Sequence, residues 1–311
     1  AYNAEKYIDK SIQSILSQSY SNIEILIAND FSTDNTLHEI KKLFHDPRVK
    51  LYNMGRKSKS PFELRNFLFT KAKGDYITFQ DADDWSDPER LEKQLRVFQD
   101  DKDMGMVGTW FNVVDKNGKF LRNARKPVKH KDILNSFGKT YPIFGPTIMI
   151  KKEVLDKVGG FRDYFPASSF LDYDWPMLIA ENFKTAQVPE FLYFYRQHGL
   201  SISKRIQPER LVMKQFFDTM ALQRKTRGMD DIQQGKLVEA KAFFEKLVKD
   251  YKRDKTRHFR DYAGIYAYNK MYFETMEASW EALKKEPFRT INQKYFFKSI
   301  YSWLQNMVYN R

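Results

Sequence analysis

Three carboxylates crowd the end of one short apolar stretch, and this acidic turn constrains the fold more than any other feature of the sequence. Residues 76–79 combine aromatic and β-branched side chains, a pattern that predicts a short buried strand. Asp81, Asp83 and Asp84 follow at once, and an Asp-Pro pair then opens a helix. The fold must therefore join a strand end to a helix start around a concentrated negative charge.

The repulsion among these carboxylates calls for a positive partner. Mg²⁺ or Mn²⁺ provides one, because both ions prefer oxygen ligands and bridge one or two carboxylates to substrate phosphates. Ligands of open α/β sheets also bind beyond the carboxyl ends of the strands, where this turn lies. Taken alone, the Asp-x-Asp (DxD) pattern is more typical of an acidic loop with helix-capping aspartates. The flanking strand and the capped helix favour the metal site.

Apolar patterns on either side of the acidic turn predict alternating helices and strands. Before the turn, helices are expected over 5–17 and 61–72, and strands over 23–28 and 49–52. After it, strands are expected over 104–114, 119–121, 146–150 and 185–195. The pair Asn117-Gly118 predicts that the first two of these later strands form a hairpin.

The composition fits a water-soluble globular protein with one large domain and an appendage. Of the 311 residues, 42% are hydrophobic and 30% charged, and no run of 18 or more apolar residues predicts a membrane span. The chain has no cysteine, which excludes disulfides and thiolate chemistry and fits a reducing compartment. No secretory signal pattern appears at the start of the sequence. Because the absence of cysteine fits a reducing compartment, we expect a cytoplasmic protein.

Positive charge is concentrated in the last third of the chain. Lysine and arginine exceed aspartate and glutamate by 3 in residues 1–200 and by 10 in residues 201–311, which together make the net charge of +13. A basic surface of this kind favours anionic lipid headgroups, anionic polymers or nucleic acid. A solvated helical face is the alternative.

Three further segments carry polar residues in compact patterns. NDFSTDNT at 29–36 follows the predicted strand 23–28, FLDYDW at 170–175 opens a predicted helix, and YRQHGLSIS at 195–203 closes the last predicted strand. Together with KGDYITFQDADD at 73–84, these segments resemble four motifs of family 2 glycosyltransferases, in the same order. That conjunction is far more specific than any one motif.

The resemblance implies the GT-A fold, an α/β architecture with a Rossmann-like, mostly parallel sheet flanked by helices. It covers residues 1–203, and residues 204–311 would form a basic, all-helical C-terminal extension. Family members usually carry one more strand before the turn at Ala1, Tyr2 and Asn3, so we expect the natural protein to have residues upstream of Ala1.

The resemblance also implies an inverting glycosyltransferase with a nucleotide-sugar donor, most simply a UDP-sugar. In the family the acidic residue at the position of Asp30 contacts uracil, and a carboxylate can accept the imide N–H. Asn29 and Phe31 depart from the family's Asp and Gly and leave the nucleobase open. The resemblance also places Arg65 near the donor pocket, and a salt bridge to a structural carboxylate is its alternative role. The donor-binding residues expected in this way are Tyr2, Asn3, Asp30, Arg65, Asp81, Ala82 and Asp83.

The same comparison gives a metal site and a general base. The ion, Mn²⁺ or Mg²⁺, would be held by Asp83, Asp81, Asp84 and His198, although a hydrogen-bonded structural role is equally open to the histidine. Asp172 matches the carboxylate that acts as general base in inverting members, and capping the helix it opens is its alternative role. Leu171 stands where the family commonly has Glu.

The expected reaction moves a hexosyl or N-acetylhexosaminyl group to a hydroxyl of a glycan or lipid-linked acceptor in surface polysaccharide synthesis. Two alternatives stay open. A nucleotidyltransferase also uses an aspartate pair and a cation beyond a parallel sheet. A catalytically decayed binding or scaffold protein would instead use the basic tail as its working surface.

The end of the chain suggests where the protein works. Helices are expected over 211–220, 237–248, 258–269, 272–283 and 295–308, and the last is amphipathic and rich in aromatic residues. With its basic neighbours it could rest on an anionic membrane, at the inner face of the plasma membrane. Packing on the catalytic domain or on a second protomer of a homo-oligomer are the alternatives. We do not expect nucleic acid as a partner.

Overall fold

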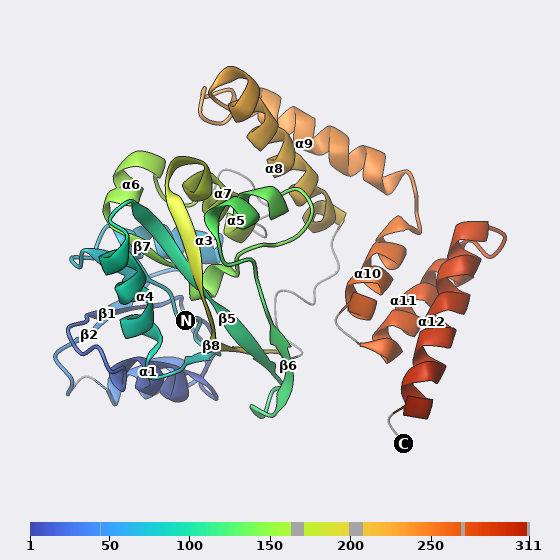
Figure 1. Ribbon diagram of the computed structural model, residues 1–311. Helices are drawn as coiled ribbons and strands as arrows, with labels where there is room; N and C mark the ends of the chain where they lie inside the picture. The colour runs from blue at the N-terminus through green and yellow to red at the C-terminus, as the bar shows by residue number, and fades with distance from the viewer. Residues whose placement is uncertain (44, 163–170, 199–207, 269–270, 310–311) are drawn as a thin grey trace. The chain divides into compact units, whose positions relative to one another are not determined.

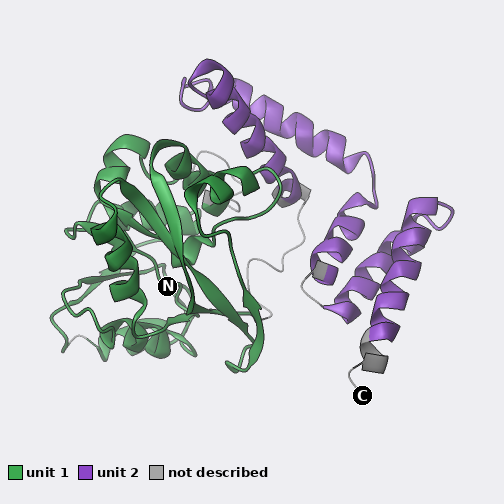
Figure 2. Cartoon of the chain, in the orientation of Figure 1, with its two compact units in different colours: residues 1–201 green, residues 202–311 purple. Residues whose placement is uncertain are grey.

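The computed structural model describes residues 1–311 except 44, 163–170, 199–207, 269–270 and 310–311. The chain divides into two compact units, Ala1–Ser201 (unit 1) and Ile202–Arg311 (unit 2), coloured green and purple in Figure 2. The domain boundary expected after residue 203 lies outside the described residues.

Unit 1 alternates strands and helices along the chain (Figure 1). Its strands are β1 (Ile25–Asn29), β2 (Val49–Asn53), β3 (Tyr76–Thr78), β4 (Trp85–Ser86), β5 (Met104–Val114), β6 (Phe120–Ala124), β7 (Met149–Lys151) and β8 (Lys184–Arg196). Its α-helices are α1 (Ile8–Leu16), α2 (Thr36–Lys41), α3 (Pro61–Phe69), α4 (Arg90–Asp100), α5 (His130–Ser136), α6 (Glu153–Val158) and α7 (Leu171–Asn182). The α/β class expected from the sequence is confirmed.

The strands of unit 1 form two sheets. The larger has the order β3-β7-β5-β8-β4 with β6 paired on β5, and the smaller joins β1 to β2. Of the strand pairs in the described residues, β1–β2 and β5–β8 are parallel, whereas β3–β7, β5–β7, β4–β8 and β5–β6 are antiparallel. The larger sheet is thus mixed rather than mostly parallel. A buried strand is apolar on both faces in either direction, so its sequence does not reveal its direction.

Helices cover these sheets through the apolar stripes that their sequences predict. Ile8 and Ile12 of α1 pack with Ile27 of β1 in one buried cluster. Leu95 and Phe98 of α4 pack in another cluster against β5 and β8. The spacing of three or four residues between stripe positions places them on one helical face. Helix α1 directly precedes β1, and α4 follows the acidic turn. The packing of these two helices therefore fixes the surroundings of the turn.

Two local predictions need correction. The strand expected over 146–150 begins only at Met149, because Gly145–Thr147 forms a 3₁₀ turn (η1). Pro146 has no N–H to donate to a neighbouring strand, which favours the turn. The short strand β4 was not expected, and it pairs antiparallel with β8 directly after the acidic turn.

Unit 2 is built from helices alone within the described residues. They are α8 (Pro208–Arg227), α9 (Leu237–Lys252), α10 (Arg257–Tyr268), α11 (Tyr272–Lys285) and α12 (Thr290–Tyr309), and each contains or overlaps a predicted helix. Phe216 and Phe217 of α8 are fully buried, and Phe216 contacts Phe244 of α9. No helix in the described part has the length and hydropathy needed to cross a bilayer.

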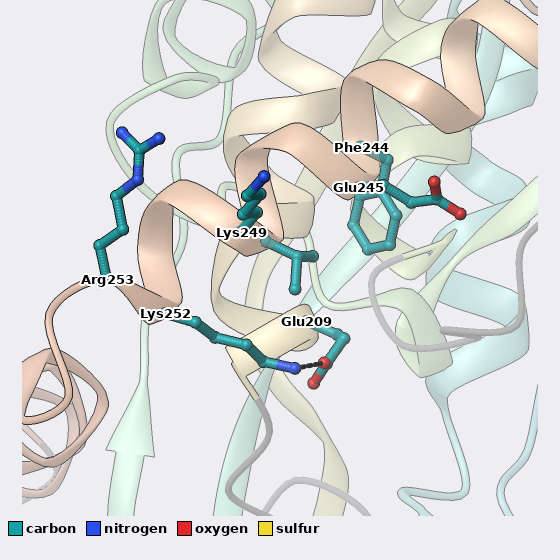
Figure 3. Close-up of a pocket in the computed structure, with 7 residues that line it drawn as sticks. Glu209, Phe244, Glu245, Lys249, Lys252 and Arg253 are labelled. Atoms are coloured by element: carbon teal, nitrogen blue, oxygen red, sulfur yellow. Dashed lines mark hydrogen bonds and ion pairs between the residues drawn. The ribbon is translucent and has the colours of Figure 1, made fainter.

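Unit 2 also contains a pocket of about 580 Å³. Residues of α8 and α9, with Arg253, line it, and Lys252 donates to Glu209 at 2.6 Å. Figure 3 shows this pair meeting while Arg253 points away from it. The lining is part apolar and part ion-paired, and none of its residues belongs to the motifs that the sequence singled out.

Candidate active site

The acidic turn lies between β3 and β4 and is placed by β8. Trp85 pairs with Phe194, and Ser86 pairs with Tyr193. This pairing brings the last residues of β8 beside the three carboxylates, although more than a hundred residues separate the two segments in the chain. The structure thus joins the Asp-x-Asp segment to the segment that contains His198.

Asp84 is the buried anchor of the turn. Its side chain accepts a hydrogen bond from the Tyr193 hydroxyl at 2.9 Å and another from the Arg196 backbone N–H at 2.7 Å. The Tyr193 oxygen in turn accepts from the Asp81 N–H at 3.2 Å. Asp84 is only 1% exposed, and burial, with the charges of Asp83 and Asp81, raises its pKa well above the ordinary value. Both carboxylate oxygens are therefore committed to the fold.

Asp83 is partly exposed and contacts His198, the histidine expected at the metal site. Its Oδ2 lies 2.8 Å from His198 Nε2, and its side chain is 31% exposed. Burial and the neighbouring Asp81 raise the pKa of Asp83, because both disfavour a second negative charge. The Arg196 side chain donates to the Asp83 carbonyl at 2.8 Å, which fixes the backbone under this carboxylate. Asp83 is thus held in place but still accessible.

Asp81 forms an ion pair with Arg65. The Arg65 guanidinium donates to Asp81 Oδ1 at 2.6 Å. It also lies 5.2 Å from the ring centroid of Phe79 and 5.8 Å from that of Phe161, so an aromatic wall holds it. The Asp81 side chain is 35% exposed. Arg65 therefore orients Asp81 and offsets part of its charge.

These residues fit a metal site that the substrate completes. In the part of the chain that the structure describes, no three His, Cys, Asp or Glu side chains are gathered closely enough to hold an ion by themselves. Mg²⁺ commonly binds through one or two carboxylates plus phosphate and water. Asp83 and Asp81 are two partly exposed carboxylates on one turn, which suits that mode. Asp84 does not, since its oxygens are already engaged.

Asp30, the residue expected to contact the base, is buried against the loop that contains Lys57 and Ser58. Asp30 accepts from Lys57 Nζ at 2.6 Å, and from the N–H and hydroxyl of Ser58 at 2.7 and 2.8 Å. Burial alone would raise the pKa of Asp30, but the hydrogen bonds from Lys57 and Ser58 hold it below its ordinary value. The Lys57 ammonium also sits 2.9 Å from the centre of the Tyr2 ring. One lysine therefore contacts two of the expected donor-binding residues.

Asn3 and Ala82, two further residues expected to bind the donor, contact neighbouring parts of the fold. The Asn3 side-chain oxygen accepts from the Thr33 N–H at 2.9 Å, which braces the turn after β1. Asn3 adopts a left-handed conformation with φ of 47°, which asparagine tolerates better than most residues. Ala82 packs against the buried cluster of α1 and β1.

Asp172 lies in the first turn of α7 beside η1. A Cβ built on Gly145 would come within 3.1 Å of the Asp172 Cβ, so the glycine allows this close approach. Asp174, two residues further along α7, is fully buried and paired with Arg162, whose Nε donates to it at 2.8 Å. The two carboxylates thus differ: Asp174 has a structural ion pair, whereas Asp172 is only half-buried. Residues 163–170, which precede α7, lie outside the described residues.

Comparison with known proteins decides the family. Residues 1–159 match the family described as Glycosyl transferase family 2. The chain belongs to glycosyltransferase family 2. It is 34% identical over 209 residues to the putative glycosyltransferase EpsE of Bacillus subtilis, covering 66% of this chain and 73% of that protein. It is 36% identical over 206 residues to the O-antigen biosynthesis glycosyltransferase WbnJ of Escherichia coli, covering 64% and 78%.

Solved structures confirm the GT-A fold of this glycosyltransferase. S. aureus TarS 1-349, in complex with UDP-GlcNAc, matches with a TM-score of 0.60 at 16% identity, over 96% of this chain and 87% of that one. Mannosyltransferase PcManGT from Pyrobaculum calidifontis, in complex with GDP-Man and Mn²⁺, matches with a TM-score of 0.54 at 17% identity, over 99% and 85%. The matched family and the named relatives make the chain a glycosyltransferase enzyme rather than a nucleotidyltransferase.

Sequence reasoning missed the residues that hold the site together. Tyr193 and Arg196 anchor the acidic turn, and Lys57 and Ser58 cover Asp30. Arg196 belongs to the Tyr-Arg-x-His motif, so its position was a usable signal. Tyr193 lies in a run of aromatic residues on β8, where nothing local distinguishes it from a core side chain.

Proposed function

We propose that this enzyme is an inverting, metal-dependent glycosyltransferase that moves a hexosyl or N-acetylhexosaminyl group from a UDP-sugar to an acceptor hydroxyl. The observation that carries the proposal is the arrangement of Asp81 and Asp83: two accessible carboxylates on one turn, each oriented by a partner, Arg65 or His198. A turn built in this way suits the diphosphate of a donor bound through a cation.

The donor side of the proposal rests on Asp30 and Tyr2. A carboxylate accepts the N–H of uracil, and an aromatic ring offers a stacking surface for the base. Both residues contact Lys57, so donor binding requires that this lysine move aside. Structural neighbours have been solved with UDP, UDP-GlcNAc and GDP-Man. Uracil is our choice because Asp30 supplies the acceptor that its imide needs.

A bound Mn²⁺ or Mg²⁺ would offset the negative charge that grows on the departing diphosphate. Asp83 would hold the ion directly and Asp81 would be its second ligand. His198 keeps the Asp83 carboxylate in place and lies close enough to complete the site. Asp84, through Tyr193 and Arg196, fixes the backbone of the turn and is proposed as an anchor rather than a ligand.

Asp172 is the proposed general base. Its carboxylate would take the proton of the acceptor hydroxyl while that oxygen bonds to the anomeric carbon. The bond to the diphosphate oxygen breaks on the opposite side, so the anomeric configuration inverts. Gly145 lets η1 approach Asp172 closely, and buried Asp174 holds α7 by its pairing with Arg162.

The biological setting that we propose is surface polysaccharide synthesis. One relative is named for O-antigen biosynthesis, and shorter matches are named chondroitin synthase and hyaluronan synthase. A glycan or a lipid-linked glycan is therefore the proposed acceptor. A lipid-linked acceptor would be met at the inner face of the plasma membrane, where a peripheral enzyme could reach it.

The test is a donor screen that measures the released nucleotide. We expect slow release of UDP from one UDP-sugar with Mn²⁺, which EDTA abolishes and a correct acceptor accelerates. Asp83→Asn should lower the rate by about 100-fold or more, because one ligand and its charge are lost. Asp103→Asn, at a side chain that is 82% exposed, is the matched control and should keep full activity.

Three results would overturn the proposal. The first is release of pyrophosphate instead of a nucleoside diphosphate. The second is a rate that does not respond to EDTA. The third is full activity in Asp83→Asn.

A further inference from the structure

The outer face of α12 carries an exposed aromatic stripe. α12 packs on α11 with the opposite face, where Asn292 and Ser299 are buried and the Asn292 side chain donates to the Ala282 carbonyl at 2.9 Å. Along the outer face, Phe297, Tyr301 and Leu304 recur at helical spacing and are 66%, 62% and 49% exposed. Figure 1 shows α12 lying alongside α11 within unit 2. Such a stripe on a surface helix marks a contact face.

The charges beside this stripe have one sign. Lys294 and Lys298 lie one helical turn apart and adjoin the aromatic residues on the helical wheel. From 287 to 311 the sequence contains no aspartate or glutamate. Arg289, at the start of this segment, is already paired with Asp254 at 2.7 Å and Glu286 at 2.8 Å, outside α12. The face therefore combines apolar rings with lysines and offers no acidic side chain of its own helix.

We propose that this face of α12, the aromatic stripe with Lys294 and Lys298, docks the enzyme on an anionic lipid surface. The inference deepens the proposed function, since a lipid-linked acceptor would be presented at that surface. Aromatic side chains sit well at the headgroup level, where the ring is buried and a tyrosine hydroxyl remains wet. Lysine stems can lie along the apolar layer while their ammonium groups reach lipid phosphates.

A second copy of the chain fits this face less well. In a two-fold dimer the same patch meets itself, so Lys294 and Lys298 of one copy would approach those of the other. No acidic residue of α12 is available to offset that repulsion. An anionic bilayer instead supplies the missing negative charge over its whole area. Charge complementarity thus selects the lipid surface as the occupant.

The experiment measures binding of the full chain to vesicles. Sedimentation with neutral phosphatidylcholine vesicles is compared with vesicles containing phosphatidylglycerol, without nucleotide or metal. We expect binding to the anionic vesicles alone, and its loss at high salt. Lys294→Glu with Lys298→Glu should weaken binding about tenfold or more, because attraction becomes repulsion at both sites. Phe297→Gln with Tyr301→Gln should weaken it while leaving the charge unchanged.

A matched control separates this face from overall charge. Lys241→Glu with Lys246→Glu changes the net charge equally at two exposed lysines of α9. The control should retain most of the binding. The proposal is overturned if the control loses as much binding as the α12 variant, or if the wild type ignores anionic vesicles. It is also overturned if the α12 variants change only the oligomeric state.

These outcomes are independent of the proposed function. Vesicle binding requires neither a donor nor a cation, so a failed donor screen leaves the docking result intact. If the α12 variants lose vesicle binding but release UDP at the wild-type rate from a soluble donor, docking and catalysis are both supported and are separate. Thermal unfolding of each variant confirms that the chain remains folded.

Discussion

At the scale of single residues, neighbouring carboxylates have opposite tasks. Asp84 is buried with both oxygens engaged, whereas Asp83 is accessible and contacts His198. The side-chain types are identical, so the surroundings alone divide the roles. Removing a buried acceptor leaves its buried donors without a partner, so it destabilises the fold more than removing an exposed carboxylate does.

Asp84→Asn and Asp83→Asn should therefore act on different quantities. In Asp84→Asn the new amide could accept from only one of the two donors, Tyr193 and Arg196, and would turn its NH₂ group toward the other. We expect this variant to lower the free energy of unfolding by about 1–3 kcal/mol. Asp83→Asn should leave the melting temperature nearly unchanged, because the Asp83 side chain is 31% exposed and the new amide oxygen or water can still meet His198. Equal melting temperatures for both variants would contradict this division.

Phe31 carries backbone strain beside the proposed base site. Its φ of 59° is in the left-handed region, and its side chain is 53% exposed. That conformation costs about 1–2 kcal/mol for a non-glycine residue. Phe31→Gly should therefore be more stable than Phe31→Ala by about 1 kcal/mol, since only glycine relieves the strain. Thermal unfolding of the two variants measures this difference, and an alanine variant as stable as the glycine variant would refute it.

Lys126 predicts a pH dependence of stability. Its ammonium donates to the Tyr141 carbonyl at 2.6 Å, and burial, followed by the nearby Arg122, lowers its pKa from 10.5 to about 8. Between these two values the unfolded chain holds more protons than the folded one, so this group makes stability rise with pH. Relative to Lys126→Met, the wild type should gain about 1–3 kcal/mol from pH 7.5 to 10.5. Parallel pH profiles of the melting temperature would contradict the assignment.

At the scale of elements, the approach of η1 to α7 sets the position of Asp172. Gly145→Ala would place a methyl group 3.1 Å from the Asp172 Cβ, and the helix must yield slightly. We expect the turnover rate to fall about tenfold, because small displacements of a base are costly in rate. The melting temperature should change little. Gly55→Ala is the control, since nothing lies within 4 Å of its added methyl group. Unchanged turnover in Gly145→Ala would remove η1 from the account.

Elements with strong local patterns could be predicted from the sequence, and those defined by partners could not. The stripe of Ile8 and Ile12 gave α1, and the Asn-Gly pair gave the hairpin of β5 and β6. β4 has only two residues and exists because β8 pairs with it. The direction of β7 could not be predicted either, because its apolar residues would suit a parallel or an antiparallel neighbour.

At the scale of the molecule, the motifs could be located but not assembled. The sequence identified Asp83 and His198 separately. The fold brings Asp83 Oδ2 to within 2.8 Å of His198 Nε2. It did not indicate that Lys57 would cover Asp30 and Tyr2, because that contact depends on how the loop after β2 closes. The uneven charge was readable from composition. Only the structure placed Lys294 and Lys298 beside an exposed aromatic stripe.

The central claim is that the acidic turn holds the cation that receives the departing diphosphate. Anomalous diffraction at the manganese edge, from crystals soaked with UDP and Mn²⁺, tests it most directly. We expect one strong peak beside the Asp83 carboxylate and the diphosphate, and no such peak in Asp83→Asn crystals. A manganese ion bound to the diphosphate away from this turn would contradict the account.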